Sequence, residues 1–394
     1  MSSIQIADSV WAVGVKDPDL KRFDILMEIS HGTSYNAYLV KGNKKTALID
    51  TVKARFADEY FANLEEIVKT EEIDYLVVNH TESDHSGAIV PLLKRNPKIE
   101  LFCSAPALPF VRETINDDSV KVTGVKDDFE LDLGNEKLIF KITPQMHWPD
   151  TMCDYLPSEG ILFTCDGFAA HVSEHTYVDE VPGYYDEEFF DYYDKIMRFF
   201  SAYIRRNLAK IDQLEVKMIA PSHGPIIRRD VDKYLKLYHE YAADKSEGKN
   251  QAAIFYISAY GHTKELAEKF AACLKKKGYA IAMVDVMGLD EKSARDTIEQ
   301  SKALMYGTLT INGDTVPQMW HAIGLLSTVA SQSKKAAVFG SYGWGGEALK
   351  LVAERLSGMK LKVFEENYRA RLVPSEQETA ELQQYCDRFA EFIG

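Results

Sequence analysis

The C-terminal part of the chain alternates between short apolar strands and amphipathic helices, and this alternation allows very few folds. Strands are predicted near residues 252–257, 280–285, 302–306, 335–339 and 361–364. Helices are predicted near residues 264–277, 291–300, 316–328, 346–356 and 376–392. Five strands interleaved with five helices predict an α/β fold with a doubly wound, five-stranded parallel sheet, because helical crossovers are the usual connection between parallel strands.

A polar segment separates this region from the rest of the chain. Residues 244–250 read DKSEGKN and lack apolar periodicity, whereas a helix is predicted just before them, at 231–242. A chain of 394 residues is long enough for two or three domains. We therefore expect domains at residues 1–248 and 251–394.

The first half mixes strands and helices. Strands are predicted at 38–40, 46–49, 75–78, 138–142, 161–164 and 218–220, and helices at 56–69 and 188–208. The segment after the strand at 75–78 reads Asn-His-Thr-Glu-Ser-Asp-His-Ser-Gly, so four side chains that can bind metal fall within residues 80–85. On an extended backbone His80, Glu82 and Asp84 would project the same way, and Asp84 and His85 would point apart. One loop could then supply two adjacent metal positions.

Three further candidates follow later strands: His147, Asp166 and His223. Strand ends at one edge of a sheet converge in space, so we expect these side chains to join the loop. Together the candidates supply three carboxylates and four imidazoles, enough for two metals with one bridging carboxylate. A set without cysteine suits iron or manganese, with zinc as an alternative. Cys165 precedes Asp166 on a strand, so we expect its side chain on the opposite face, in the core.

Three loops at predicted strand ends of the C-terminal half indicate a phosphate and ring-binding site. Residues 258–263 join a strand to a helix N-terminus and are rich in hydroxyl groups and glycine, which suits an anion. Two more glycine-containing loops follow the third and fourth strands, and Tyr342 and Trp344 could pack on a flat ring. The candidate cofactor-binding residues are Ser258, Ala259, Tyr260, Gly261, His262, Thr263, Thr308, Leu309, Thr310, Asn312, Gly313, Ser341, Tyr342, Gly343, Trp344 and Gly345.

Both sets of residues resemble those of flavodiiron proteins, also called A-type flavoproteins. The metal loop resembles the His-x-His-x-Asp-His signature of the metallo-β-lactamase fold, with Glu82 in place of the second histidine, as in flavodiiron proteins. The resemblance implies an N-terminal metallo-β-lactamase-like αβ/βα sandwich, followed by a flavodoxin-like domain that binds FMN. It implies two irons that share Asp166. The implied ligands are His80, Glu82, His147 and Asp166 for one iron, and Asp84, His85, Asp166 and His223 for the other.

Two positions depart from the family or vary within it. The histidine equivalent to His85 does not bind metal in every member. Thr308 and Leu309 stand where the second flavin loop usually has serine and proline, so the hydroxyl is kept and the rigid turn is lost.

The resemblance also implies an activity. Flavodiiron proteins reduce O2 to water, NO to nitrous oxide, or both, with electrons supplied through FMN from a carrier such as rubredoxin. The chain lacks appended rubredoxin cysteines, so we expect a separate donor. A head-to-tail homodimer, or a dimer of dimers, would bring the FMN of one subunit to the irons of the other. Candidates for roles near the substrate are His31, Tyr35, His171, His175, Tyr192, Tyr193 and, between the cofactors, Trp148.

Two other interpretations remain open at this point. One is a dizinc hydrolase of the metallo-β-lactamase type fused to a flavodoxin-like domain, and the other is an electron carrier with an inactive first domain. The net charge of -14 disfavours nucleic acid and anionic membranes as partners. Five cysteines without a C-x-x-C pair predict free thiols in a reducing compartment. With no signal peptide or long apolar run, we expect a cytoplasmic enzyme.

Overall fold

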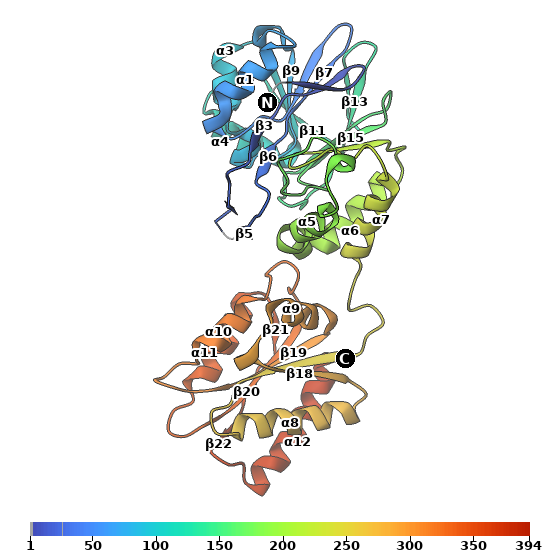
Figure 1. Cartoon of the computed structure of the whole chain (residues 1–394). Coiled ribbons are helices and arrows are strands. Elements are labelled where there is room, and N and C mark those ends of the chain that lie inside the picture. Colours follow the sequence, from blue (N-terminus) through green and yellow to red (C-terminus); the bar gives the residue numbers. More distant parts are fainter. Residues whose placement is uncertain (1–2, 26) are drawn as a thin grey trace. The chain divides into compact units, whose positions relative to one another are not determined.

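The computed structural model describes residues 3–25 and 27–394, which form two compact units, Met1–Ala243 and Asp244–Gly394 (Figure 1). Each unit contains its own sheets and buried apolar clusters. The domain limits expected from the sequence, 1–248 and 251–394, stay a prediction.

The first unit contains two large sheets that pack against each other. The seven-stranded sheet has the order β1 (Ile4–Ala7), β2 (Val10–Ala12), β7 (Tyr38–Lys41), β8 (Thr46–Ile49), β9 (Tyr75–Val78), β10 (Glu100–Ser104) and β11 (Val122–Val125). The five-stranded sheet has the order β12 (Glu130–Asp132), β13 (Lys137–Ile142), β14 (Met152–Leu156), β15 (Ile161–Cys165) and β16 (Met218–Pro221). Two small pairs join β3 (Val15–Asp17) to β6 (Thr33–Tyr35) and β4 (Arg22–Phe23) to β5 (Met27–Glu28).

Helices cover the outer face of each large sheet. The seven-stranded sheet packs on α1 (Ala57–Glu65), α3 (Ile89–Arg95) and α4 (Leu108–Ile115). The five-stranded sheet packs on α5 (Tyr185–Tyr192), α6 (Ser201–Ile211) and α7 (Val231–Ala242). Between the sheets, apolar side chains of β7–β9 contact those of β13–β15, including Val77, Phe140 and Phe163. These four layers confirm the predicted αβ/βα sandwich.

The second unit has one parallel sheet with helices on both faces. Its strands are β18 (Ala280–Asp285), β17 (Gln251–Tyr256), β19 (Ala303–Leu309), β20 (Lys335–Tyr342) and then both β21 (Lys362–Val363) and β22 (Tyr368–Arg371). Helices α8 (His262–Lys276) and α12 (Glu376–Ile393) cover one face. Helices α9 (Glu291–Gln300), α10 (Pro317–Gly324) and α11 (Glu347–Gly358) cover the other.

This architecture confirms the predicted doubly wound parallel sheet, with one difference. The fifth strand position holds two short strands, β21 and β22, because the exposed Glu365 and Glu366 interrupt it. Glutamate has a low preference for strands.

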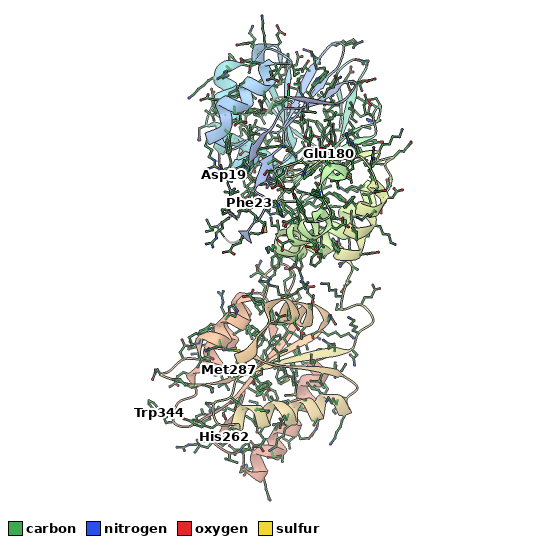
Figure 2. The ribbon with its side chains drawn as sticks, viewed as in Figure 1. Asp19, Phe23, Glu180, His262, Met287 and Trp344 are labelled. Atoms are coloured by element: carbon green, nitrogen blue, oxygen red, sulfur yellow. A yellow bond between two sulfur atoms is a disulfide. The ribbon has the colours of Figure 1, made fainter. Side chains whose placement is uncertain are left out.

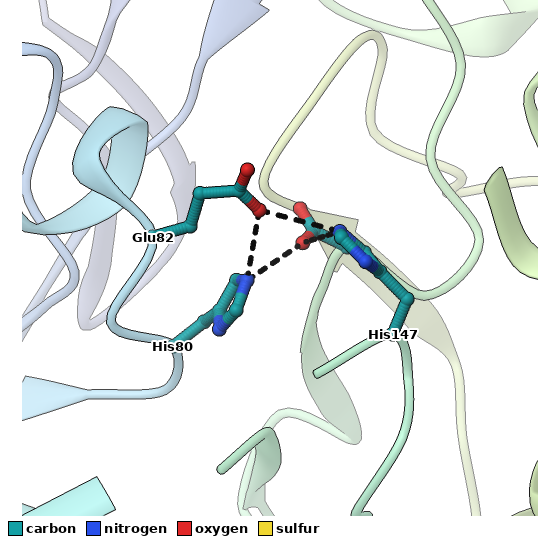
Figure 3. Close-up of side chains that lie close together, drawn as sticks. His80, Glu82 and His147 are labelled. Carbon is teal, nitrogen blue, oxygen red and sulfur yellow. Dashed lines mark hydrogen bonds and ion pairs between the residues drawn. The ribbon is translucent and has the colours of Figure 1, made fainter. Parts of the chain in front are cut away.

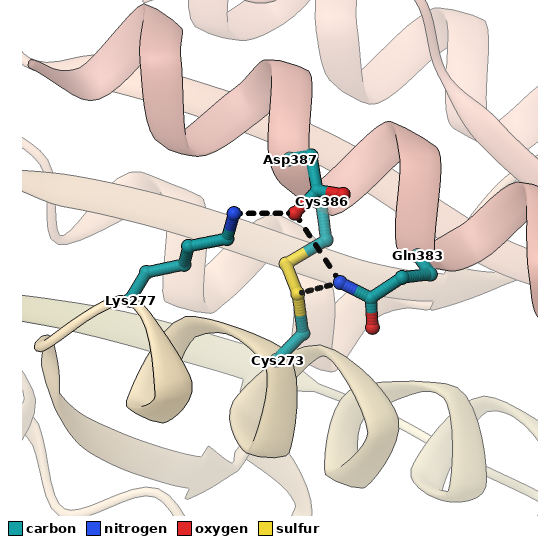
Figure 4. Close-up of a disulfide and its surroundings, with 5 residues drawn as sticks. All are labelled: Cys273, Lys277, Gln383, Cys386 and Asp387. Carbon is teal, nitrogen blue, oxygen red and sulfur yellow. Dashed lines mark hydrogen bonds and ion pairs between the residues drawn. A yellow bond between two sulfur atoms is a disulfide. The ribbon is translucent and has the colours of Figure 1, made fainter.

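A disulfide joins Cys273 of α8 to Cys386 of α12 (Figure 4). The prediction that all five cysteines are free was therefore wrong for this pair, while Cys103, Cys153 and Cys165 are free and buried. The two bonded cysteines are 113 residues apart in sequence, and only the packing of α8 on α12 brings them together. A search for closely spaced cysteines cannot detect such a pair.

Within the described residues, every helix is too short or too polar to cross a membrane.

Candidate metal centre and flavin site

The predicted metal loop lies between β9 and a short helix, α2 (Ser83–Ser86). The carboxylate of Asp50 accepts the backbone N–H of Asn79 at 2.7 Å, and the N–H of Thr51 donates to the carbonyl of His85 at 2.8 Å. These bonds hold the loop against the end of β8. His80 and Glu82 precede α2 and project the same way, as predicted, whereas Asp84 and His85 share the first turn of α2. The prediction that Asp84 follows His80 and Glu82 and points away from His85 was therefore wrong.

The first group of candidate ligands consists of His80, Glu82, His147 and Asp166, whose donor atoms all lie within 4.8 Å of one another. The carboxylate oxygen Oε2 of Glu82 is 3.1 Å from Nε2 of His80 and 3.3 Å from Nε2 of His147. Figure 3 shows these three side chains pointing toward one another. The loop at β9 and the segment between β13 and β14 thus meet at one point.

The second group consists of Asp84, His85 and His223, with donor atoms within 4.8 Å of one another. Asp166 lies between the two groups. Its Oδ2 is 3.4 Å from Nε2 of His147, whereas its Oδ1 is 3.0 Å from Nε2 of His85 and 3.4 Å from Nε2 of His223. The two oxygens of one carboxylate therefore face different groups, the arrangement that a bridging ligand requires.

Opposite charges inside this site determine its protonation. Burial alone would lower the pKa of each imidazole, but neighbouring carboxylates outweigh it. Asp166 and Glu82 raise the pKa of His147 to about 9, and Asp166 and Asp84 raise that of His223 to about 10. The pKa values of His80 and His85 are also raised.

The carboxylates respond in the opposite sense. Burial would raise their pKa values, yet the imidazoles lower those of Glu82, Asp84 and Asp166 below the ordinary range. Without metal, the opposed shifts favour the protonated form of the imidazoles and the ionised form of the carboxylates.

Three residues that orient the candidate ligands were missed in the sequence. The Nδ1 of His80 lies 3.3 Å from the carboxylate of Asp150, Nδ1 of His223 donates to the carbonyl of Ser34 at 2.7 Å, and Ser222 donates to Oδ1 of Asp166 at 2.7 Å. Each imidazole thus directs Nε2 toward the centre of the site. Asp150 and Ser222 lie within three residues of a candidate ligand, the one signal that could have indicated them.

The side chains present fit a pair of metal ions. Buried atoms of three candidate ligands have no hydrogen-bond partner in the described residues: Oδ1 of Asp84, Nε2 of His85 and Oδ2 of Asp166. Buried polar atoms are normally paired, so these atoms point to a ligand. Carboxylates with imidazoles form a donor set that suits iron.

The Cys165 side chain was expected on the face opposite Asp166, and this expectation was wrong. Its sulfur lies within 4.8 Å of the donor atoms of His85 and Asp166, although the side chain is buried as predicted. Strand alternation fails here because the pairing of β15 with β16 shifts register between Phe163 and Cys165, and Cys165 has a φ of 50°.

Two of the residues predicted to act near the substrate contact the rings of the site. Tyr35 packs edge-on against His223 with ring centroids 5.7 Å apart, and its hydroxyl accepts a hydrogen bond from Lys53. The ring of His171 is 5.5 Å from that of His223, its Nε2 has no partner in the described residues, and burial followed by His223 lowers its pKa well below the usual value. Trp148 packs edge-on against His80 at 5.0 Å.

The other four have different surroundings. His31 stacks on Tyr184 at 4.0 Å, with Glu174 and Glu188 at its nitrogens, and His175 is half-buried in the same region. Tyr193 shares a hydrogen bond with Ser201 and packs on Tyr238. The ring of Tyr192 lies 6.1 Å from that of His223.

In the second unit the three predicted loops lie at one edge of the sheet. They follow β17, β19 and β20, which are parallel neighbours in this order. The hydroxyls of Thr263 and Ser341 are 3.0 Å apart and link the first loop to the third. Trp344 and Tyr260 are 95% and 88% exposed, and Figure 2 shows Trp344 at the periphery of this unit.

The first loop fits a phosphate. Helix α8 begins after Gly261, which has a φ of 91°, and no side chain caps its first N–H groups. The buried hydroxyls of Ser258 and Thr310 have no partner in the described residues. Free donors at a helix N-terminus are what a phosphate group binds.

In the second loop, one hydroxyl, that of Thr308, is paired within the protein. The hydroxyl of Thr308 is fully buried and bonds to the hydroxyl of Thr315, so it turns away from the loop surface. Leu309 and Thr310 are half-buried, whereas Asn312 and Gly313 at the tip are exposed with φ values of 54° and 78°.

Comparisons with known proteins cover both units. Residues 33–224 match the model of the ODP family beta lactamase, and residues 254–385 match that of Flavodoxin. The chain is 38% identical over 401 residues to the flavo-diiron protein FprA2 of Clostridium acetobutylicum, covering all of both chains. It is 33% identical to the nitric oxide reductase of Moorella thermoacetica, covering 92% of each. The solved rubredoxin oxygen:oxidoreductase of Desulfovibrio gigas is 26% identical, with a TM-score of 0.71 over 100% of this chain and 98% of that one.

Proposed function

We propose the function of this chain from one premise: it belongs to the flavodiiron protein family. It is an oxidoreductase that reduces O2 to water, NO to nitrous oxide, or both, at a non-haem diiron site. Electrons reach the irons through FMN from a separate carrier of the rubredoxin type. Relatives named for nitric oxide reduction and for rubredoxin:oxygen oxidoreduction support this range of substrates and donors.

One observation supports the diiron site most strongly: the two oxygens of Asp166 face separate groups of donors. We assign His80, Glu82, His147 and Asp166 to one iron. We assign Asp84, His85, Asp166 and His223 to the other, with Asp166 as the bridge. The hydrogen bonds that the imidazoles of His80 and His223 donate to the carboxylate of Asp150 and the carbonyl of Ser34 would keep the rings in the orientation that binds metal.

We assign the FMN phosphate to residues 258–263 at the start of α8, and the flavin ring to the loops after β19 and β20. The unpartnered hydroxyl of Ser258 supports the first assignment, and the unpartnered hydroxyl of Thr310 and the exposed ring of Trp344 support the second. When bound, FMN accepts two electrons and passes them on singly, and the irons bind and reduce the gas. The protein positions both groups and supplies protons.

The Glu82 carboxylate distinguishes this proposal from a dizinc hydrolase, because a carboxylate stands where zinc hydrolases usually have an imidazole. Metal and flavin analysis of the purified protein tests the difference. We expect two irons and one FMN per chain, and two zincs without iron would contradict the proposal. Anaerobic turnover of the loaded protein with O2 or NO, with reduced rubredoxin as donor, then measures which gas is reduced.

We also propose a head-to-tail homodimer, alone or within a dimer of dimers, in the cytoplasm. The family resemblance supports the dimer. The free cysteines Cys103, Cys153 and Cys165 agree with a reducing compartment, whereas the Cys273–Cys386 disulfide does not. Mixing a Glu82→Ala chain with a Ser258→Ala chain from which FMN has been removed tests the dimer. Activity should return in mixed dimers only when electrons pass between subunits, and an inactive mixture would contradict this arrangement.

A further inference from the structure

The sulfur of Cys165 is a donor that the proposed diiron ligands leave unused. We propose that Cys165 supplies a thiolate to the metal position beside His85 and Asp166, so that this centre binds thiophilic cations as well as iron. The inference rests on the metal centre of the proposed function and adds a ligand to it.

The geometry carries the inference. The sulfur of Cys165 and donor atoms of His85 and Asp166 all lie within 4.8 Å of one another, and the three residues are at most 2% exposed. Two donors on one zinc-sized ion are separated by roughly 3.5 Å, since a metal–sulfur bond is about 2.3 Å and a metal–nitrogen bond about 2.0–2.1 Å. Side-chain rotation could bring the donor atoms from separations of up to 4.8 Å to the roughly 3.5 Å that a shared ion requires.

A donor atom without a hydrogen-bond partner lies beside the sulfur of Cys165. The Nδ1 of the buried His85 has no hydrogen-bond partner in the described residues, whereas its Nε2 lies 3.0 Å from Oδ1 of Asp166. A buried imidazole with an unpaired nitrogen beside a sulfur is a donor set, because buried polar atoms are normally paired.

The backbone directs the sulfur into the site. The register shift between β15 and β16 and the φ of 50° at Cys165 place its side chain on the face that carries Asp166. The carbonyl of Cys165 accepts the N–H of Ser222 at 2.8 Å, and Ser222 also bonds to Asp166. The bulge is therefore fixed by the same residue that orients the bridging carboxylate.

Thiolates select softer cations than carboxylates do. Cd²⁺, Zn²⁺ and Co²⁺ bind sulfur well, whereas Mn²⁺ prefers oxygen and imidazole. Binding would displace the thiol proton to solvent. Cys153 is the matched control, because it is equally buried one strand away but its sulfur shares a hydrogen bond with Thr143 and donates to the carbonyl of Thr164.

The test adds Co²⁺ to the metal-free full-length protein and records the near-ultraviolet sulfur-to-cobalt charge-transfer band. We expect the band in the wild type and in Cys153→Ser, and its loss in Cys165→Ser. Cd²⁺ affinity should fall by about tenfold or more in Cys165→Ser, the scale seen when a metal's supporting groups are removed, with Mn²⁺ affinity unchanged.

The outcomes separate this inference from the proposed function. Two bound Co²⁺ ions without the sulfur band overturn the role of Cys165 and leave the diiron centre intact. Failure to bind Co²⁺ at all overturns both. Cadmium NMR of the wild type gives a readout that does not depend on the folding of a variant: a cadmium shift typical of nitrogen and oxygen ligands alone contradicts the proposal.

Discussion

Asp154 places a carboxyl group in the middle of β14, where both neighbouring strands supply aromatic rings. Its partners across the sheet are Phe140 and Phe163, and the side chain is fully buried. Neither carboxyl oxygen has a hydrogen-bond partner of ordinary geometry in the described residues. Burial, followed by repulsion from Asp50, raises the pKa of Asp154 well above its usual value. We predict that Asp154→Asn stabilises the protein at neutral pH.

The magnitude follows from proton linkage. In the unfolded chain the carboxyl has a pKa of about 3.9, so it loses its proton there while the folded form keeps it. The folded state then binds more protons, and stability falls by at most about 1.4 kcal/mol for each pH unit until the folded pKa is reached. Between pH 5 and 7 this gives an upper bound of about 2.7 kcal/mol, or at most roughly 5–11 °C in Tm for a domain of this size. Asparagine fits the same space without ionising.

Thermal unfolding of the full chain at pH 5, 6 and 7 measures the effect. We expect the Tm of Asp154→Asn to exceed that of the wild type by an amount that grows with pH. Asp118→Asn is the control, because Asp118 is exposed in the same unit and should show no such trend. A Tm difference that stays constant across pH, or a less stable variant at pH 7, would refute the reasoning.

Three other predictions address the metal site, the flavin and the disulfide. Glu82→Ala should lower the iron content while FMN remains bound, as iron analysis and flavin absorbance will report; unchanged iron would contradict the assignment of Glu82. Ser258→Ala should weaken FMN binding by about tenfold or more, the effect of losing a hydrogen bond to a charged group, and should leave riboflavin binding unchanged in fluorescence titrations. Cys386→Ser should lower the free energy of unfolding by about 4–5 kcal/mol, because the Cys273–Cys386 bond closes a loop of 113 residues. Denaturation of the wild type with and without reductant checks this. An equal midpoint under both conditions would show that the bond is absent.

Periodicity and strand-end position predicted much of the fold because both depend on local sequence. The strands that carry the metal loop, Asp166 and His223 were all located, since each is a short apolar run followed by polar residues. The direction of individual side chains was less predictable. Alternation failed at Asp84 because α2 starts there, and at Cys165 because β15 shifts register.

Contacts between distant segments were also hidden in the sequence. The Cys273–Cys386 bond and the hydrogen bond from His223 to Ser34 join residues more than a hundred positions apart. Thr308 stays a predicted flavin-binding residue, and its hydroxyl bonds to that of Thr315, a contact that sequence alone cannot indicate. Such choices depend on packing.

At the metal centre, iron and protons compete for the same imidazole nitrogens. Without metal, the neighbouring carboxylates favour the protonated forms of His80, His85, His147 and His223. Each iron that enters must then displace protons from the imidazoles that bind it. Acidification therefore competes with iron for this centre, and the iron affinity should fall as the pH is lowered.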